Sequence, residues 1–345
     1  MTTAAVVCGL GGSLPETVVS NDELAAQLDT SDEWIRTRTG ISRRHVIKPG
    51  DATSDLAVEA GRRALESARA QDGTAADAID LVVLATSTPD HPCPATAPLV
   101  AQRLGLGGVA AFDVSAVCTG FVYALAAAAS MLSAGTARRA LVIGADTFST
   151  ILDPHDRTTR AIFGDGAGAV VLRRGEAGEP GALLGFDLGS DGAGAEMITV
   201  RAGGSRQRST GLAAPEGDQW FSMEGRAVFT EAVLNMSKSA QELIGRIGWA
   251  GEGPDRVVAH QANVRILRAV GEQLGLDESQ IVVNLDRVGN TVAGSIPLAL
   301  ADAMASGELR PGHRTLLTGF GGGLTWGSTA LIWPELATVP THIDA

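Results

Sequence analysis

The chain has few cysteines. Its three, Cys8, Cys93 and Cys118, are odd in number and widely spaced, and no two form a Cys-x-x-Cys pair. A small disulfide framework and a cysteine-based zinc site are therefore not suggested. What is left for these residues is packing or thiol chemistry.

Long hydrophobic runs and excess positive charge are also missing. The longest predominantly apolar run, Phe121–Leu132, is too short to span a bilayer, and the opening MTTAAVVCGLGG lacks the basic segment of a secretory signal. We therefore expect a cytoplasmic protein. The net charge of −12 argues against nucleic acid and anionic membrane as partners, and is still compatible with a local basic patch.

Apolar residues are plentiful and regularly arranged. With 345 residues, 45% of them hydrophobic, the chain can bury a large core. Alanine-rich helical stretches, such as Leu56–Ala70 and Met223–Ile247, alternate with apolar runs typical of buried strands. These runs are Asp80–Thr86, Ala140–Ile143, Ala169–Leu172, Arg256–Ala259 and Thr315–Leu317. The alternation predicts an α/β fold.

A weak internal repeat divides the chain. IDLVVLATSTPD resembles PDRVVAHQAN, and each half closes on a glycine-rich turn that leads into an apolar strand, FGDGAGAVVL and FGGGLTWGSTALIW. We expect two similar halves, residues 1–180 and 181–345, packed against each other. The strand ends of both halves would then meet and gather four residues in one place: Cys118, His260, Asn290 and Gly322.

The glycine-rich turns do not predict a phosphate site. A phosphate-binding loop joins a strand to a helix, whereas FGDGAGA and FGGG both lead into a strand. Tight turns with close backbone approach explain their glycines better. The polar segment Gly192–Gly217 is predicted to be a long excursion between the halves.

Cys118 is predicted to lie at the start of a helix that runs to about Ser133 and ends at Gly135. Free N–H groups and the helix dipole at that position favour a thiolate over a thiol. Cysteine is also a common buried packing residue, and this bland interpretation stays open for Cys118 taken alone.

His260 and Asn290 each have an ordinary explanation too. His260, in VVAHQAN, ends an apolar strand and precedes a predicted helix, Val264–Leu274, so a satisfied core histidine fits equally well. Asn290 lies in a turn before a helix that we expect Ser295 to cap, with Pro297 in its first turn. Turn chemistry alone accounts for an asparagine after glycine.

Seven segments taken together resemble β-ketoacyl-[acyl-carrier-protein] synthase III, a condensing enzyme of the thiolase superfamily. In family order they are DTSDEWIRTRTGI, FDVSAVCTGF, DRTTRAIFGDGAGA, MEGRAVF, HQANVRIL, GNTVAGSIPLAL and GFGGGLTWG, and they cover nearly the whole chain. The resemblance implies a thiolase-like fold, in which two pseudo-repeated halves are packed in α/β/α/β/α layers, and a homodimer.

The same resemblance implies a catalytic site. Cys118 would be the nucleophile that becomes acylated, and His260 and Asn290 would donate hydrogen bonds to the enolate formed by decarboxylation. The backbone N–H groups of Cys118 and Gly322 would hold the tetrahedral oxyanion. No metal or resident cofactor is then expected, because coenzyme A enters as a thioester substrate.

Substrate contacts are implied at further positions. Trp34 and Arg157 align with residues that sandwich the adenine of coenzyme A, whereas surface cover and a solvated loop charge are their ordinary roles. Arg38 would meet the coenzyme A phosphates, and Asn263 the pantetheine arm.

Three other residues concern the carrier protein and the starter. Arg265 and Arg268 share the face of a helix opposite its apolar residues, and we expect them to dock the acidic carrier protein, although an ordinary solvated face is the alternative. Cys93 aligns with a loop that lines the partner's acyl pocket, where acetyl-preferring members commonly carry phenylalanine. This predicts a starter larger than acetyl, with a small buried spacer as the bland alternative.

The expected reaction condenses an acyl-CoA starter with malonyl-ACP to give 3-oxoacyl-ACP, CO2 and free coenzyme A, and primes fatty-acid or polyketide synthesis. An acyltransferase that acts on a hydroxyl or amine of a specialised metabolite is the main alternative, and Asn290 counts against it because no enolate would form. A biosynthetic thiolase normally has a second active cysteine, and none follows Cys118. A non-catalytic chain-length factor should lack the nucleophile.

Overall fold

Two β-sheets form the framework of the protein, whose computed structural model describes residues 3–73 and 78–337. The first sheet has the strand order β1-β7-β6-β4-β5, in which β4 is parallel to β5 and β6, and β7 is antiparallel to β6 and β1. Its strands are β1 (Thr3–Ser13), β4 (Leu81–Ala85), β5 (Ala110–Val114), β6 (Arg139–Asp146) and β7 (Gly166–Glu176).

The second sheet repeats the pattern of the first. Its order is β11-β12-β13-β8, with β11 parallel to β12 and the other pairs antiparallel. Its strands are β8 (Leu183–Ser190), β11 (Arg256–Ala259), β12 (Arg314–Gly321) and β13 (Thr325–Ile332). A parallel bridge from Val257 to Ile281 stands where β5 pairs with β4 in the first sheet. The boundary at residue 180 stays a prediction, and it falls between β7 and β8.

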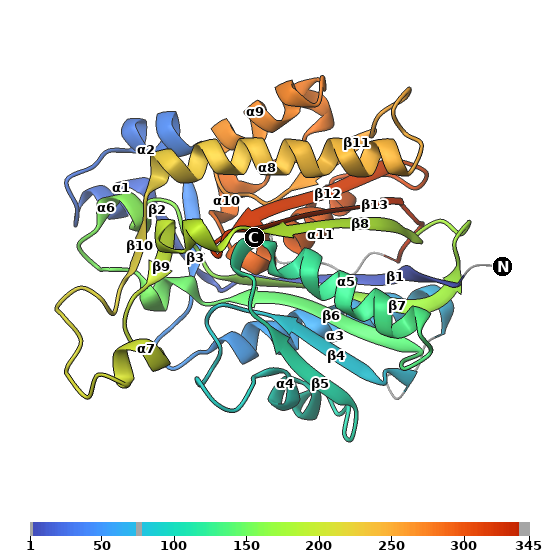
Figure 1. Cartoon of the computed structure of the whole chain (residues 1–345), viewed down its shortest axis with the longest axis horizontal. Helices are drawn as coiled ribbons and strands as arrows, with labels where there is room; N and C mark the ends of the chain where they lie inside the picture. Colours follow the sequence, from blue (N-terminus) through green and yellow to red (C-terminus); the bar gives the residue numbers. More distant parts are fainter. Residues whose placement is uncertain (1–2, 74–77, 338–345) are drawn as a thin grey trace.

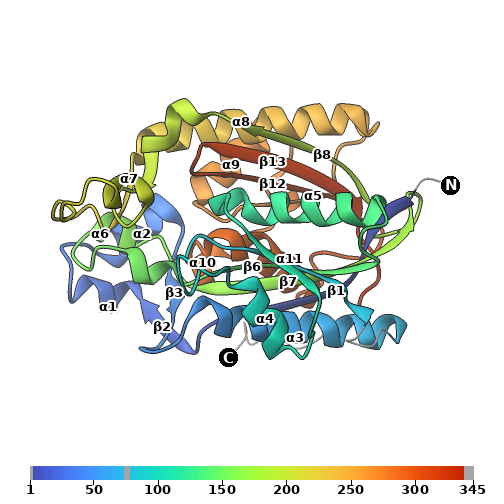
Figure 2. The same ribbon diagram turned by 60° about the horizontal axis from the view of Figure 1, so that its bottom comes forward.

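Helices separate and cover the sheets. α3 (Thr53–Asp72) and the short α4 (Ala97–Arg103) lie on the outer face of the first sheet, and α8 (Gly225–Arg246) and α9 (Val264–Gln273) on the outer face of the second (Figures 1 and 2). α5 (Gly120–Ser133) and α11 (Ser295–Ala305) lie between the sheets. The layer order is therefore α/β/α/β/α, as the family resemblance implied.

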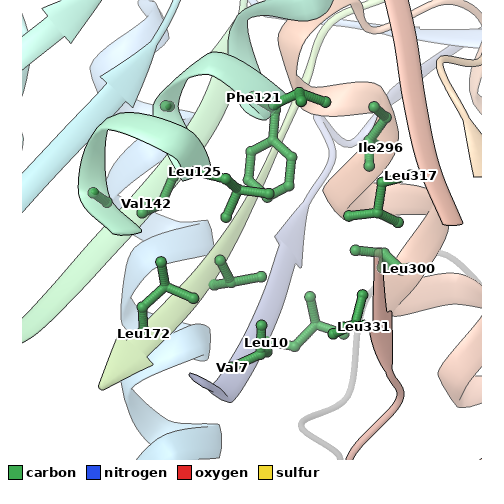
Figure 3. Packing of buried hydrophobic residues seen from close by; sticks show 14 of the residues in the cluster. Val7, Leu10, Phe121, Leu125, Val142, Leu172, Ile296, Leu300, Leu317 and Leu331 are labelled. Atoms are coloured by element: carbon green, nitrogen blue, oxygen red, sulfur yellow. The ribbon is translucent and has the colours of Figure 1, made fainter. Parts of the chain in front are cut away.

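The main core lies around the two central helices. A helix that is covered on every side has no face exposed to solvent on which polar residues could lie. The residues of α5 and α11 are accordingly almost all apolar. Figure 3 shows Phe121 and Leu125 of α5 facing Ile296 and Leu300 of α11, and each of these four side chains is at most 2% exposed. This packing fixes the starts of both helices relative to each other.

Short elements gather at one end of the layers (Figure 1). They are β2 (Thr17–Ser20), α1 (Asn21–Ala25), α2 (Asp32–Thr39), β3 (Arg43–Val46), α6 (Arg157–Arg160), β9 (Ile198–Val200), α7 (Ser205–Arg208) and β10 (Phe221–Met223). The predicted excursion Gly192–Gly217 follows β8 and therefore lies within the second half and not between the halves, and its β9 pairs with β10. None of the helices in the described ranges has the length and apolar character that a membrane span needs.

Candidate active site

Cys118 lies in a strained turn. A single 3₁₀ turn, Val117–Thr119, precedes α5, so the helix begins at Gly120 and not at the cysteine as predicted. Val117 has a φ of +47°. A β-branched residue rarely adopts this left-handed conformation, and it persists only where the surrounding structure holds it. The turn sets the position of the thiol at the entrance to α5.

A second turn of the same kind follows Asn290. The 3₁₀ turn Val292–Gly294 precedes α11, and Val292 has a φ of +51°. The Val292 N–H donates to Asn290 Oδ1 over 2.9 Å, and the Asn290 N–H donates to the Ile162 carbonyl over 2.9 Å. Because Oδ1 is engaged in this way, the amide nitrogen Nδ2 is the end of Asn290 that can serve as a donor.

His260 is held at the end of β11. Its backbone N–H donates to the Thr318 carbonyl over 2.8 Å, and its Nδ1 lies 2.6 Å from Ser295 Oγ. The side chain is almost wholly buried, and burial lowers the pKa of His260 to about 3. The imidazole is therefore neutral at pH 7. Ser295 is not the predicted cap of α11, since Gly294 occupies that position and the serine hydroxyl reaches His260 instead.

The three predicted catalytic side chains line one pocket. Its other walls are apolar, and they come from the segment before Cys118, from β9 and β10, and from α8, α9 and β12. The complete lining is Val117, Cys118, Phe148, Phe163, Ile198, Phe221, Met223, Val228, Ala232, Met236, His260, Ala262, Ile266, Asn290 and Phe320. The convergence expected from the repeat is therefore present for Cys118, His260 and Asn290.

Three phenylalanines form an aromatic cluster beside Cys118, a grouping that sequence reasoning missed. The distance between ring centroids is 4.6 Å for Phe148 and Phe163, 4.9 Å for Phe148 and Phe221, and 5.1 Å for Phe163 and Phe221. All three are buried in the same apolar cluster as Cys118. Phe221 packs edge to face on the other two rings, an arrangement that aromatic pairs prefer, and the three rings together form one apolar wall of the pocket.

Burial raises the pKa of the Cys118 thiol, and the nearby Asp146 carboxylate adds to this effect. The expected preference for a thiolate is therefore outweighed by burial. The thiol of Cys118 is protonated at rest, and its proton has to leave as the sulfur attacks.

Asp146 is a site residue that sequence reasoning missed. It is fully buried at the end of β6, where it accepts hydrogen bonds from the Ser87 N–H at 2.7 Å, Thr88 Oγ1 at 3.0 Å and the Ala293 N–H at 3.0 Å. Burial raises the pKa of this carboxyl to about 7. An acidic residue that ends the buried run RALVIGAD was the available signal.

Gly322 lies beside the pocket, while its neighbour Gly321 packs on Cys118. A Cβ added to Gly321 would lie 2.7 Å from the Cys118 backbone nitrogen. A Cβ added to Gly322 would lie 3.1 Å from a methyl carbon of Ile198, which lines the pocket. The close approach of β12 to the cysteine turn thus requires glycine at 321.

The four predicted coenzyme A residues are brought together. The guanidinium carbons of Arg38 and Arg157 lie 4.9 and 5.3 Å from the centroid of the half-buried Trp34 ring. Asn263 Nδ2 donates to the Arg38 carbonyl over 3.0 Å, and its Oδ1 caps α9 by accepting the Arg265 N–H. Asn263 therefore joins this group to the helix that follows His260.

The remaining predicted residues lie on the surface. Arg265 and Arg268 are both exposed on α9, but Arg268 forms an ion pair with Glu278 at 3.0 Å, which leaves Arg265 as the less neutralised charge of the two. Cys93 is exposed and does not line the pocket of its own chain. Within residues 3–73 and 78–337, no three His, Cys, Asp or Glu side chains are grouped as a metal site.

Two stacked sheets around a pair of central helices, with a cysteine, a histidine and an asparagine that line one pocket, define a thiolase-like protein. Models of the 3-oxoacyl-[acyl-carrier-protein] synthase III family match residues 112–192 and, for its C-terminal part, residues 244–333. The chain is 58% identical to β-ketoacyl-[acyl-carrier-protein] synthase III 5 of Streptomyces coelicolor over 98% of its length and 100% of that protein.

Solved structures agree with this comparison. The crystal structure of 3-oxoacyl-(acyl carrier protein) synthase III, FabH, from Pseudomonas aeruginosa PAO1 superposes with a TM-score of 0.88 at 54% identity, covering 98% of this chain and 100% of that one. The priming β-ketosynthase of the R1128 polyketide pathway gives 0.88 at 32% identity, over 96% and 97% of the two chains. The protein therefore belongs to the β-ketoacyl-[acyl-carrier-protein] synthase III family and is an enzyme of the acyltransferase type.

Proposed function

We propose that the protein condenses an acyl-CoA starter with malonyl-ACP to give 3-oxoacyl-ACP, CO2 and free coenzyme A. The observation that carries this proposal is the meeting of the Cys118 thiol, His260 and Asn290 in one apolar pocket. A nucleophile alone would suffice for acyl transfer, whereas two neutral donors beside it suit a reaction that passes through an enolate.

The first half-reaction forms an acyl-enzyme. The Cys118 sulfur attacks the thioester carbonyl of acyl-CoA, the bond to the coenzyme A sulfur breaks, and the proton of Cys118 leaves with the coenzyme A thiol. The Cys118 N–H, in the 3₁₀ turn before α5, and the Gly322 N–H would hold the oxyanion. Gly321 leaves room for this, because any side chain there would press on the Cys118 nitrogen.

The second half-reaction forms the carbon–carbon bond. The bond from malonyl C2 to its carboxylate breaks, CO2 leaves, and the electron pair moves into an enolate whose oxygen accepts hydrogen bonds from His260 Nε2 and Asn290 Nδ2. The enolate carbon then attacks the acyl carbonyl on Cys118, and the released thiolate takes a proton from solvent. This route needs no metal and no resident cofactor, because coenzyme A acts only as the carrier of the starter.

Substrate binding is proposed from the surface residues. Trp34 with Arg38 and Arg157 offers an aromatic face and two guanidinium groups for the adenine and phosphates of coenzyme A. Asn263 would meet the pantetheine arm. Arg265 on α9 would dock the acidic carrier protein, a proposal that Arg265→Glu tests: the KM for malonyl-ACP should rise at low salt, and an unchanged KM would reject it.

We further propose a cytoplasmic homodimer in which the Cys93 loop of each chain lines the partner's acyl pocket and admits a starter larger than acetyl. The kcat/KM values of acetyl-, isobutyryl- and hexanoyl-CoA test this in the parent and in Cys93→Phe. The parent should favour a larger starter, and the variant should shift toward acetyl. An acetyl preference that Cys93→Phe leaves unaltered would refute the proposal.

The reaction itself is tested by incubating the protein with these acyl-CoAs and malonyl-ACP and weighing the carrier-protein products. A 3-oxoacyl-ACP two carbons longer than the starter supports condensation. Acyl-enzyme with no such product would favour transfer to a hydroxyl or amine acceptor instead. Whether the product enters fatty-acid or polyketide synthesis depends on the carrier protein that the enzyme prefers.

A further inference from the structure

The contact between His260 and Ser295 joins the pocket to a central helix. Nδ1 of the histidine and Oγ of the serine lie 2.6 Å apart, and the two residues are 3% and 1% exposed. Ser295 is the first residue of α11, which packs against α5 through the next residue, Ile296, and through Leu300 (Figure 3). A buried hydrogen bond of this length holds the imidazole in one orientation.

The chemistry of the partner determines the charge of the ring. A carboxylate at Nδ1 would favour the imidazolium, whereas a hydroxyl is neutral, and burial lowers the pKa of His260 to about 3. The neutral ring carries one proton, on Nδ1 or on Nε2. The direction of the hydrogen bond between Ser295 and Nδ1 therefore decides whether the other ring nitrogen, Nε2, carries the proton.

A second contact indicates the direction of the hydrogen bond. Ser295 Oγ also receives the Gln261 N–H, at 3.4 Å. A hydroxyl that accepts from a backbone N–H keeps its own proton free, and the nearest acceptor for that proton is His260 Nδ1. With Nδ1 as acceptor, the proton of the neutral ring is on Nε2.

We infer that Ser295 is a positioning residue that holds His260 in the tautomer with a proton on Nε2, so that this nitrogen donates to the enolate oxygen in the condensation step. The inference rests on the proposed function. It also predicts a separation of steps, because an Nε2–H group cannot accept the Cys118 proton. Loss of Ser295 should therefore impair condensation and spare acylation of the cysteine.

The test is Ser295→Ala, with Ser237→Ala as the matched control. Ser237 is a buried serine on α8 whose hydroxyl has no hydrogen-bond partner, so its loss removes a buried oxygen without touching His260. Ser295→Ala should lower kcat for condensation about tenfold to a hundredfold, with the KM for malonyl-ACP and the rate of Cys118 acylation unchanged. Ser237→Ala should match the parent.

A spectroscopic readout keeps the test independent of turnover. In protein with ¹⁵N-labelled histidine and no substrate, His260 should show an unprotonated Nδ1 and a protonated Nε2, and Ser295→Ala should change that pattern. Ser295→Thr, which keeps the hydroxyl, should restore it. Nδ1 protonated in the parent, or acylation and condensation reduced equally in Ser295→Ala, would overturn the inference. Absence of any 3-oxoacyl-ACP from the parent would instead reject the proposed function.

Discussion

The turns that precede α5 and α11 are built alike and used differently. Each is a three-residue 3₁₀ turn that opens with a valine at positive φ, +47° at Val117 and +51° at Val292. The next residue is Cys118 in the first turn and Ala293 in the second. The first turn presents a thiol to the pocket, whereas the second holds the Asn290 side chain through the Val292 N–H.

The strands that contact these turns differ at one corresponding position. β6 and β12 both have eight residues, RALVIGAD and RTLLTGFG, so Asp146 in one corresponds to Gly321 in the other. The Asp146 carboxylate accepts the Ala293 N–H at 3.0 Å. Gly321 offers the Cys118 N–H no side chain. The Ala293 N–H is therefore bound to a carboxylate, whereas the Cys118 N–H is left available for a substrate oxyanion.

The largest expected effect follows from exchanging Cys118 and Ala293, the second residues of the two 3₁₀ turns. Cys118→Ala should abolish transfer of the starter to the protein, because no other described cysteine lines the pocket. Adding Ala293→Cys should not restore transfer, since Ala293 is 1% exposed and its N–H is held by Asp146. The intact mass of each variant after incubation with acyl-CoA measures this. Acylation of the double variant would mean that the two turns are interchangeable.

The next effect comes from giving the last residue of β12, Gly321, a side chain, as the last residue of β6 has. Gly321→Ala places a Cβ 2.7 Å from the Cys118 nitrogen, and Gly321→Asp adds a carboxylate of the kind that holds Ala293. Both should lower kcat about 10²–10³-fold, the usual cost of losing one oxyanion donor. Gly322→Ala is the matched control, and its loss should be smaller because its Cβ meets only the Ile198 side chain and backbone. Equal losses at 321 and 322 would contradict the assignment.

Asp146 gives a stability effect. Asp146→Ala leaves the Ser87 and Ala293 N–H groups without their acceptor, and should lower the free energy of unfolding by about 3 kcal/mol. Its pKa of about 7, raised by burial from an ordinary 3.8, means that the native state binds this proton more tightly than the unfolded chain. The contribution of Asp146 to stability should therefore fall as pH rises from about 4 to 7.

Urea unfolding of the parent and of Asp146→Asn at several pH values measures this pH dependence of stability. The stability difference between the two should change across this window in favour of the variant as pH rises. A difference that is constant from pH 4 to pH 8 would mean that Asp146 does not titrate in the native protein.

The smallest effect concerns His260. Its native pKa of about 3 lies below the value near 6.5 of an unfolded histidine, so the unfolded chain binds the proton more tightly and stability is lost as pH falls through 6.5. Between pH 7.5 and 5 the loss amounts to about 2 kcal/mol. His260→Gln should lack this part of the pH dependence. Parallel stability curves for parent and variant would show that the imidazole is not held neutral.

Much of the fold was predictable because short apolar runs are sufficient to predict buried strands. Four of the five predicted runs lie within strands, the fifth, Asp80–Thr86, extends one residue beyond each end of β4, and α3 and α8 begin and end within three residues of their predicted bounds. The repeat predicted that Cys118, His260 and Asn290 would meet, and the three side chains do line one pocket. Only His260 directly follows a strand, whereas Cys118 and Asn290 lie in or beside the 3₁₀ turns before α5 and α11.

The details that failed depend on contacts between distant segments. Ser295 satisfies the sequence pattern of a helix cap, but its hydroxyl finds a closer partner in His260, 35 residues away. The pKa of Cys118 depends on burial and on Asp146, neither of which is visible in the run VSAVCTGF. Asp146 itself is tolerated because Ser87, Thr88 and Ala293, from two separate segments of the chain, supply donors to it.

The central claim is that different side chains serve the two half-reactions, with acylation at Cys118 and condensation supported by Asn290. One measurement tests it most directly: the masses of the enzyme and of the carrier protein after incubation of Asn290→Ala with acyl-CoA and malonyl-ACP. The variant should become acylated on Cys118 as the parent does, while 3-oxoacyl-ACP forms about 10²–10³-fold more slowly. A variant that fails to become acylated but still decarboxylates malonyl-ACP would contradict the claim.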